Sequence, residues 1–202
     1  IKIKKFVVAV PDIWIPSWLK KKVDTSLVAN LGSYIKKKYR DVTYFRGIDY
    51  HMDQIDFPNE TSDFITMYIY LNDTTSQMSP LNIVKKSHVF GATKFPHAIK
   101  DYKNLDYLKY GPNFKKQKNF KKQTLLGQKG TTFIWTSLTL HGTQPQKDDK
   151  DFRVSLRYLI KKSSKNKQLI DDIIQSKNSK KSLRTDINFK TFKQVKFNKI
   201  LK

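Results

Sequence analysis

Most of the hydrophobic pattern along the chain is typical of β-strands. Residues 64–71 give the clearest case, because every residue there is β-branched, aromatic or otherwise apolar. Shorter runs of the same kind, bounded by polar or turn-forming residues, predict strands over 1–10, 42–48, 81–84, 131–135 and 152–160. Successive strands joined by short turns favour a barrel or sandwich over repeated β-α-β units. The sequence therefore predicts a mostly β fold.

Two other stretches have a helical period. In the first, apolar residues recur at every fourth position with lysines between them, at Leu19, Val23, Leu27, Leu31 and Ile35. This spacing places the apolar side chains on one side of an amphipathic helix, which we expect over 17–39. A shorter apolar group over 169–174 predicts a second helix.

The composition divides the chain into two parts. Residues 1–160 hold the predicted strands and form one β domain, with residues 1–41 as its N-terminal helical support. Residues 161–202 are lysine-rich and contain no Gly or Pro. We expect them to form a partly helical C-terminal extension, with a further packing element over 189–197.

Residues 92–124 show little periodicity and many Lys, Tyr, Asn and Phe residues. A long loop insertion in a compact domain is usually functional, such as an active-site lid, or disordered. We therefore expect an irregular loop there that influences the choice of substrate.

Length and composition narrow the chemistry. The 202 residues suffice for one domain with a sizeable core, and 13% aromatic residues supply packing volume. Cysteine is absent, which excludes disulfides and thiolate metal sites, so a metal would have to bind to His and carboxylate groups. The absence fits a reducing compartment, and we expect a cytoplasmic location. No run approaches the roughly 18 apolar residues of a membrane span.

The net charge of +23, from 40 basic and 17 acidic residues, has two interpretations. It could attract an anionic partner or substrate, including nucleic acid. The excess is nearly all Lys, scattered among Asn, Ile and Tyr, so a general lysine bias explains it equally well.

His51 and Asp53 are the first candidate site residues. On a strand, residues two positions apart have side chains on the same face. An imidazole beside a carboxylate is two-thirds of the 2-His-1-carboxylate set that holds non-haem Fe(II) with open positions. Taken alone, such a pair more often belongs to a surface turn with a capping Asp.

Four further residues fit this chemistry. His141, at a predicted strand end, supplies a second imidazole. Arg153 on the next strand could pair bidentately with the distal carboxylate of a 2-oxo acid. Ser155 lies on the same strand face as Arg153 and can donate to that carboxylate, and Thr143 adds a hydroxyl on the metal's face.

With these motifs the chain resembles the phytanoyl-CoA dioxygenase (PhyH)-like branch of the Fe(II)/2-oxoglutarate oxygenases. The resemblance covers about residues 44–160. Its motifs are His51-x-Asp53, Ser79-Pro-Leu-Asn-Ile-Val-x-x-Ser-His88-x-x-Gly91, Gly130-x-x-x-Ile-Trp135, and His141-Gly-Thr followed by Arg153-x-Ser155.

The resemblance implies a double-stranded β-helix (jelly-roll, cupin-like) core. It implies Fe(II) bound by His51, Asp53 and His141, and 2-oxoglutarate bound by Arg153 and Ser155. Together with O₂ these cofactors would hydroxylate an unactivated C–H bond of a small-molecule or lipid-type substrate, with release of succinate and CO₂.

Other residues have less certain roles. On the strand over 64–71, one face carries Ile65, Met67, Ile69 and Leu71, and the other Thr66, Tyr68 and Tyr70. We expect Ile69 on the apolar face to contact the co-substrate. Arg157 shares a face with Arg153, and could bind a substrate anion or pair with an acidic residue.

For five more residues we expect mainly structural or supporting roles. Arg46 is expected to form a salt bridge and Trp135 to pack in the core. His88 is expected in a turn and His97 at the surface. Gln54 could orient the metal site or touch the substrate.

Two other functions remain open. The first is a nucleic-acid dealkylase of the AlkB kind, which the net charge favours. The spacing disfavours it, because that family's second Arg should lie six residues beyond the first, whereas Arg157 lies four beyond Arg153. The second is a jelly-roll that has lost turnover and serves as a basic binding module, although an intact site argues against such decay.

Overall fold

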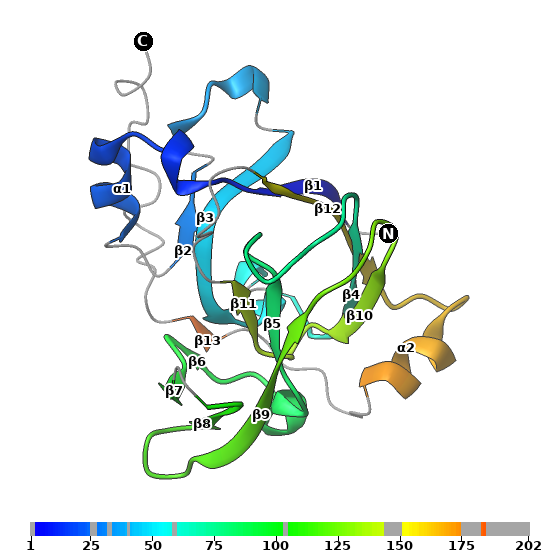
Figure 1. Ribbon diagram of the computed structural model, residues 1–202. Helices are drawn as coiled ribbons and strands as arrows, with labels where there is room; N and C mark the ends of the chain where they lie inside the picture. The colour runs from blue at the N-terminus through cyan, green and yellow to red at the C-terminus, as the bar shows by residue number, and fades with distance from the viewer. Residues whose placement is uncertain are drawn as a thin grey trace.

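The computed structural model describes residues 3–24, 28–31, 34–39, 41–57, 60–102, 105–143, 151–174 and 183–184. Its centre is one long sheet with two four-stranded halves (Figure 1). The first half has the order β10 (Thr132–Thr136), β4 (Phe64–Tyr70), β12 (Arg153–Lys161) and β1 (Ile3–Ala9). The second has the order β3 (Val42–His51), β11 (His141–Thr143), β5 (Leu81–Val84) and β9 (Lys118–Leu125).

Pairing within each half is antiparallel, and the parallel pair β1–β3 joins the halves. From β3 onward the chain passes repeatedly from one half to the other, and the halves curve around a shared interior (Figure 1). This crossing order is that of a double-stranded β-helix, so the predicted jelly-roll fold is confirmed. The interior is filled by a cluster from both halves that includes Phe45, Tyr68, Leu81 and Trp135.

Residues 92–124 do not form the expected irregular loop. They contain β6 (Lys94–Phe95), β7 (Ala98–Asp101), β8 (Tyr107–Gly111) and the start of β9. Strands β7, β8 and β9 form an antiparallel meander that extends the second half of the sheet. The prediction was wrong because only one face of the meander is buried, by residues such as Leu108 and Tyr110, while lysines alternate with them on the other.

The N-terminal helix is shorter than predicted. α1 (Ser17–Asp24) ends in its second turn, and β2 (Val28–Asn30) then pairs with β3. The apolar residues Leu19 and Leu31 do reach one cluster, but from a helix and from the end of a strand rather than from one continuous helix. The description of 1–41 as a helical support was also wrong, since β1 lies between β12 and β3 in the sheet.

Short 3₁₀ turns complete the N-terminal and central parts of the chain: η1 (Asp12–Trp14), η3 (Lys37–Tyr39), η4 (Asp53–Asp56) and η5 (Ser87–Phe90).

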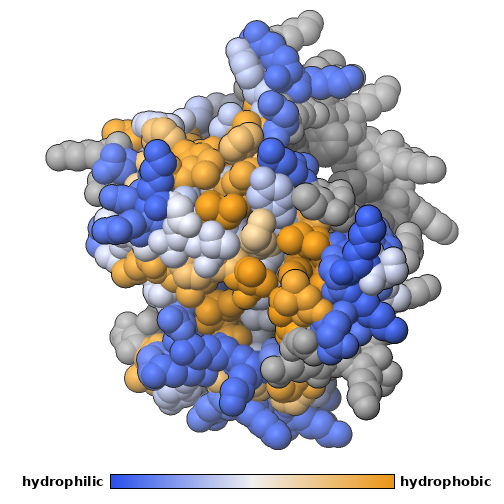
Figure 2. Space-filling view, turned by 90° about the vertical axis from the view of Figure 1, so that its right-hand side faces the viewer, coloured by the Kyte–Doolittle hydropathy of each residue, from blue (hydrophilic) through white to orange (hydrophobic). Residues whose placement is uncertain are grey.

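The second helix packs against the first half of the sheet. α2 (Lys167–Ile174) confirms the second predicted helix, and its buried Ile170 packs against Ile65 of β4. β13 (Leu183–Arg184) pairs with β6, and the element expected over 189–197 lies outside the described residues. On the face in Figure 2, hydrophilic residues (blue) border an apolar area (orange) instead of covering it. Among the described helices, none has the length and apolar character needed to cross a membrane.

Candidate metal centre

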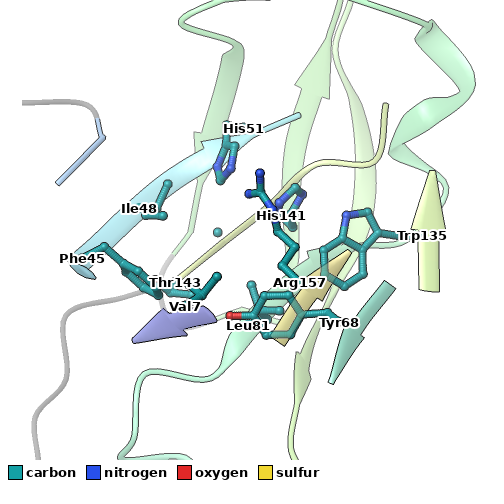
Figure 3. Close-up of a pocket in the computed structure, with 11 residues that line it drawn as sticks. Val7, Phe45, Ile48, His51, Tyr68, Leu81, Trp135, His141, Thr143 and Arg157 are labelled. Carbon is teal, nitrogen blue, oxygen red and sulfur yellow. The ribbon is translucent and has the colours of Figure 1, made fainter. Parts of the chain in front are cut away.

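His51, Asp53 and His141 come together inside the jelly-roll. His51 ends β3, His141 begins β11, and the two are directly paired in the sheet. One potential ligand atom from each of the three residues lies within 4.8 Å of the others, and all three side chains are buried. Figure 3 shows both imidazoles pointing into one pocket. Two nitrogens and one carboxylate oxygen fit a divalent transition metal such as Fe(II).

Asp53 reaches the cluster in a slightly different way than the sequence suggested. It is not on the strand, because β3 ends at His51 and Asp53 is the first residue of η4. Met52 between them keeps extended angles (φ −105°, ψ 139°) and packs into a different cluster of the core. The alternation of side chains therefore continues for two residues beyond the strand, and Asp53 faces the same way as His51.

The backbone fixes the orientation of both imidazoles. Nδ1 of His51 lies 2.8 Å from the carbonyl oxygen of Asp49, and Nδ1 of His141 lies 3.0 Å from that of Thr139. An Nδ1–H donating to a carbonyl leaves Nε2 as the nitrogen with a free lone pair. Both rings thus present Nε2 as the potential ligand atom.

Burial and charge set the protonation state of the cluster. Burial lowers the pKa of His141 to about 4, against the opposing influence of the Asp53 charge. For Asp53, burial alone would raise the pKa, but His141, Arg157, His51 and a hydrogen bond from Thr66 lower it to about 2. At neutral pH the cluster therefore holds a neutral His141 and an ionised Asp53, the forms that bind a divalent cation.

The two oxygens of Asp53 have different surroundings. Oδ2 accepts hydrogen bonds from the Thr66 hydroxyl and, at 3.1 Å, from the Trp135 indole N–H. Oδ1 accepts no hydrogen bond. It lies 3.6 Å from Nε2 of His141 and 3.4 Å from a terminal nitrogen of Arg157. A buried carboxylate oxygen without a hydrogen bond is a position at which a metal ion fits.

Arg153 is the second unusual group of this interior. It is fully buried, donates through Nε to the carbonyl oxygen of Ser79 at 2.9 Å, and through one terminal nitrogen to Tyr68 and Ser155. The guanidinium also lies over the ring of Phe45, 5.3 Å from its centroid. Its other terminal nitrogen has no hydrogen-bond partner. Among the residues that the structure describes, no carboxylate is placed within salt-bridge distance of it.

Thr143 adds a further unsatisfied donor. It lines the same pocket as His51, His141 and Tyr68, and its buried hydroxyl has no hydrogen-bond partner. A buried cation and a buried hydroxyl with unused donor capacity are both groups that can bind an anion.

Ile69 requires a correction. It pairs in the sheet with Leu156 and Thr132, and lies on the face of β4 opposite to Tyr68. Tyr68 lines the pocket, Thr66 bonds to Asp53, and Tyr70 fills the interior cluster. The polar row of β4 therefore faces the site, and the expectation for Ile69 was wrong because hydrophobicity alone was taken to indicate the inner face.

The two remaining arginines of interest form ion pairs. Arg157 lines the pocket and lies between Asp53 and Asp56, 4.0 Å from the latter. This is the acidic pairing, one of the two roles expected for it. Arg46 forms the expected salt bridge, with contacts of 2.6 and 2.9 Å to the two carboxylate oxygens of Asp12.

His97 and Gln54 also differ from or refine the sequence interpretation. His97 was expected at the surface but is buried, with Nδ1 2.8 Å from the hydroxyl of Thr93. Gln54 supports the loop after the metal motif, because its amide nitrogen donates to the carbonyl oxygens of Phe57 and Glu60. His88 lies in η5, as expected for a turn residue.

Sequence reasoning missed three residues that shape the site, namely Thr66, Tyr68 and the N–H of Trp135. A signal for the first two was present, since Thr66 and Tyr68 share one face of β4. A strand whose polar face points into a buried interior must find partners there, and here Asp53 accepts from Thr66 while Arg153 donates to Tyr68.

The chain is distantly similar to solved structures. No family model matches it, and no curated protein matches it. The crystal structure of the non-heme alpha ketoglutarate dependent epimerase SnoN from nogalamycin biosynthesis matches with 18% identity, 56% of this chain, 38% of that chain and a TM-score of 0.40. AviO1 from Streptomyces viridochromogenes is 11% identical, with 79% of this chain and 49% of that chain covered and a TM-score of 0.43. The carbocyclase SnoK, also from nogalamycin biosynthesis, is 17% identical, with 61% of this chain and 50% of that chain covered and a TM-score of 0.40.

This chain thus spans at most half the length of these three proteins. TM-scores of this size carry no conclusion about fold or function. The fold assignment rests on the strand order given above, and the narrower resemblance to the PhyH-like branch stays a prediction.

Proposed function

We propose that this chain is an Fe(II)- and 2-oxoglutarate-dependent dioxygenase that hydroxylates an unactivated C–H bond of a small-molecule or lipid-type substrate, releasing succinate and CO₂. The observation that supports this most is a fully buried arginine with no acidic partner among the described residues, in the same interior as a buried His-Asp-His cluster. A metal cluster alone fits many activities. The added buried cation favours a co-substrate that carries a carboxylate.

Each residue has a defined part in this proposal. His51, Asp53 and His141 would hold the metal, and Arg153, assisted by Ser155 and Thr143, would bind the distal carboxylate of 2-oxoglutarate. Once bound, Fe(II), 2-oxoglutarate and O₂ supply the oxidising chemistry.

The rest of the pocket restricts access to that chemistry. Apolar side chains, including Val7, Phe45 and Leu81, line it together with His51, His141 and Thr143 (Figure 3). Such walls exclude water from the reacting groups and favour an apolar part of a substrate.

Turnover tests the proposal. Purified protein with Fe(II), ascorbate and 2-oxoglutarate should release succinate when screened against candidate substrates. His141→Ala should abolish that release, whereas His88→Ala, which removes a histidine of η5 outside the cluster, should not. Equal succinate release by wild type and His141→Ala would count against the proposal.

A nucleic-acid substrate is the second candidate, and the meander favours it. Lys100 and Lys109 are exposed and directly opposite each other on β7 and β8, an arrangement of like charges that is unfavourable without an anionic partner. Binding of single-stranded DNA or RNA that weakens steeply with salt, together with repair of methylated bases, would favour this candidate over a small molecule.

A further inference from the structure

Thr66 and Trp135 form a cross-strand pair beside the metal cluster. They are directly opposite each other in the antiparallel pair β4–β10, so their side chains lie on the same, inward face. Both donate a hydrogen bond to one and the same atom, Oδ2 of Asp53. All three side chains are buried, which makes these bonds the means by which the carboxylate is held.

The two donors use the full capacity of that oxygen. A carboxylate oxygen has two lone pairs, and the hydroxyl and the indole N–H occupy both. Oδ1 is left without a hydrogen bond and lies 3.6 Å from the ligand nitrogen of His141. The carboxylate is therefore held by two hydrogen bonds to Oδ2, whereas Oδ1 is directed at the cluster and forms an ion pair with Arg157, at 3.4 Å.

We infer that Thr66 and Trp135 are positioning residues that make Asp53 bind the metal ion through Oδ1 alone. The inference rests on the proposed function, because it requires a metal at this cluster. A carboxylate can bind a metal through one oxygen or two. The second mode would occupy a position that a three-ligand set leaves open for co-substrate and O₂.

Packing alone does not account for Trp135. Its ring lies against Tyr68 and His141, with ring centroids 5.7 and 5.0 Å away, which a phenylalanine would partly reproduce. The indole N–H adds a donor that is needed only if Oδ2 must be engaged. Trp135→Phe and Thr66→Val therefore remove the donors while keeping apolar side chains of similar shape.

The test uses the full chain and Co(II) as a redox-stable probe for the metal. Affinity is measured by competition with a chromophoric chelator for wild type, Thr66→Val, Trp135→Phe and the double variant. Loss of each donor should weaken Co(II) binding several-fold, and loss of both about 10- to 100-fold. Thr66→Ser, which keeps the hydroxyl, should bind like wild type, as should Ile134→Val, whose exposed side chain lies on the other face of β10.

A second measurement distinguishes positioning from a general structural role. Infrared difference spectra with and without the metal report the separation of the two carboxylate stretching bands, which narrows when both oxygens bind. The double variant should show the narrowed separation, and urea midpoints identify any variant that does not fold.

The outcomes separate the two proposals. Wild-type protein that binds no Co(II) overturns the proposed function and this inference together. Wild-type protein that binds Co(II), with a folded double variant of unchanged affinity and unchanged band separation, overturns the inference alone.

Discussion

A buried arginine usually lies beside a carboxylate, and among the residues that the structure describes Arg153 has no such neighbour. Its guanidinium contacts a carbonyl, two hydroxyls and aromatic rings, and one terminal nitrogen has no partner. Burying such a charge costs free energy that an anion would recover. Under the proposed function, the arginine lowers the stability of the ligand-free protein and raises its affinity for 2-oxoglutarate.

We expect Arg153→Met to change the stability of the ligand-free protein little and to weaken 2-oxoglutarate binding strongly. Without ligand, the free energy of unfolding of the variant should lie within about 2 kcal/mol of that of wild type, because an apolar side chain replaces a buried charge. Its affinity for 2-oxoglutarate, measured by calorimetry with Mn(II) in place of iron, should fall at least about 100-fold. Arg46→Met removes an arginine that is paired with Asp12 and should leave this affinity unchanged. Unaltered binding to Arg153→Met would refute the assigned role.

The cluster also predicts how stability depends on pH in the metal-free protein. The pKa of His141 is about 4 when folded and has an ordinary value of 6.5, so the unfolded chain takes up the proton first as the pH falls. The free energy of unfolding should decrease between about pH 6.5 and pH 4, by about 3 kcal/mol at most. Asp53, with its pKa of about 2, adds a further loss below its ordinary value of 3.8.

Urea unfolding midpoints between pH 4 and pH 7 measure this dependence. His141→Gln, which cannot titrate, should show a flatter profile over the same range. A wild-type profile as flat as that of the variant would contradict the protonation states given above.

At the scale of elements, the site depends on how closely β11 approaches β3. The pairing shifts by one residue between His141↔His51 and Thr143↔Ile48, which indicates a bulge in β3. Gly142 lies opposite this bulge, and a Cβ there would be 2.7 Å from the carbonyl oxygen of Ile48. Only glycine allows this approach, and with it the pairing of the two histidines.

Gly142→Ala is therefore expected to move β11 away from β3. The free energy of unfolding should fall by about 1–3 kcal/mol, and metal affinity should fall as well because His141 is the adjacent residue. Gly130→Asn serves as the control, since space around Gly130 is open and asparagine tolerates its positive φ of 89°. Metal affinity that is unchanged in folded Gly142→Ala would show that the close approach is dispensable.

Element types were predictable from the sequence to different degrees. Strands with an apolar or aromatic run, such as 64–71, were predicted within a residue or two, and His51, Asp53, His141 and Arg153 were identified by residue type and order. The prediction of one helix over 17–39 was wrong because β2 pairs with β3. The local periodicity of the sequence does not reveal such a contact between separate segments. The prediction of the inner face of β4 was wrong because the polar residues Thr66 and Tyr68 have buried partners, Asp53 and Arg153. These partners are distant in sequence and come close only in the fold.

At the scale of the whole molecule, strands from both halves of the jelly-roll contribute to the candidate site. The metal cluster comes from β3, the residues that follow it, and β11, whereas Arg153 and Ser155 come from β12. Residues of both halves line one pocket, including His51 and His141 from the second half and Tyr68 and Arg157 from the first (Figure 3). Arg153 donates a hydrogen bond to the hydroxyl of Tyr68.

The meander β7–β8–β9 extends the second half beyond this pocket and carries exposed lysines. If its positive face serves an anionic substrate, Lys100→Glu combined with Lys109→Glu should raise KM at low salt and leave the metal affinity unchanged. Steady-state kinetics at two ionic strengths measure the effect once a substrate is found. The same double change at Lys4 and Lys5 of β1 is the charge-matched control. An equal rise in KM in the two double variants would indicate that only the net charge of the protein matters.

The proposed function requires one interior site to bind Fe(II) and 2-oxoglutarate together. Anaerobic titration of the protein with both can be monitored through the weak metal-to-ligand charge-transfer absorption of the chelate. We expect a saturable band in wild type and in His88→Ala, and no band in His141→Ala. Absence of the band in wild-type protein, or a band of equal intensity in His141→Ala, would refute the proposed site.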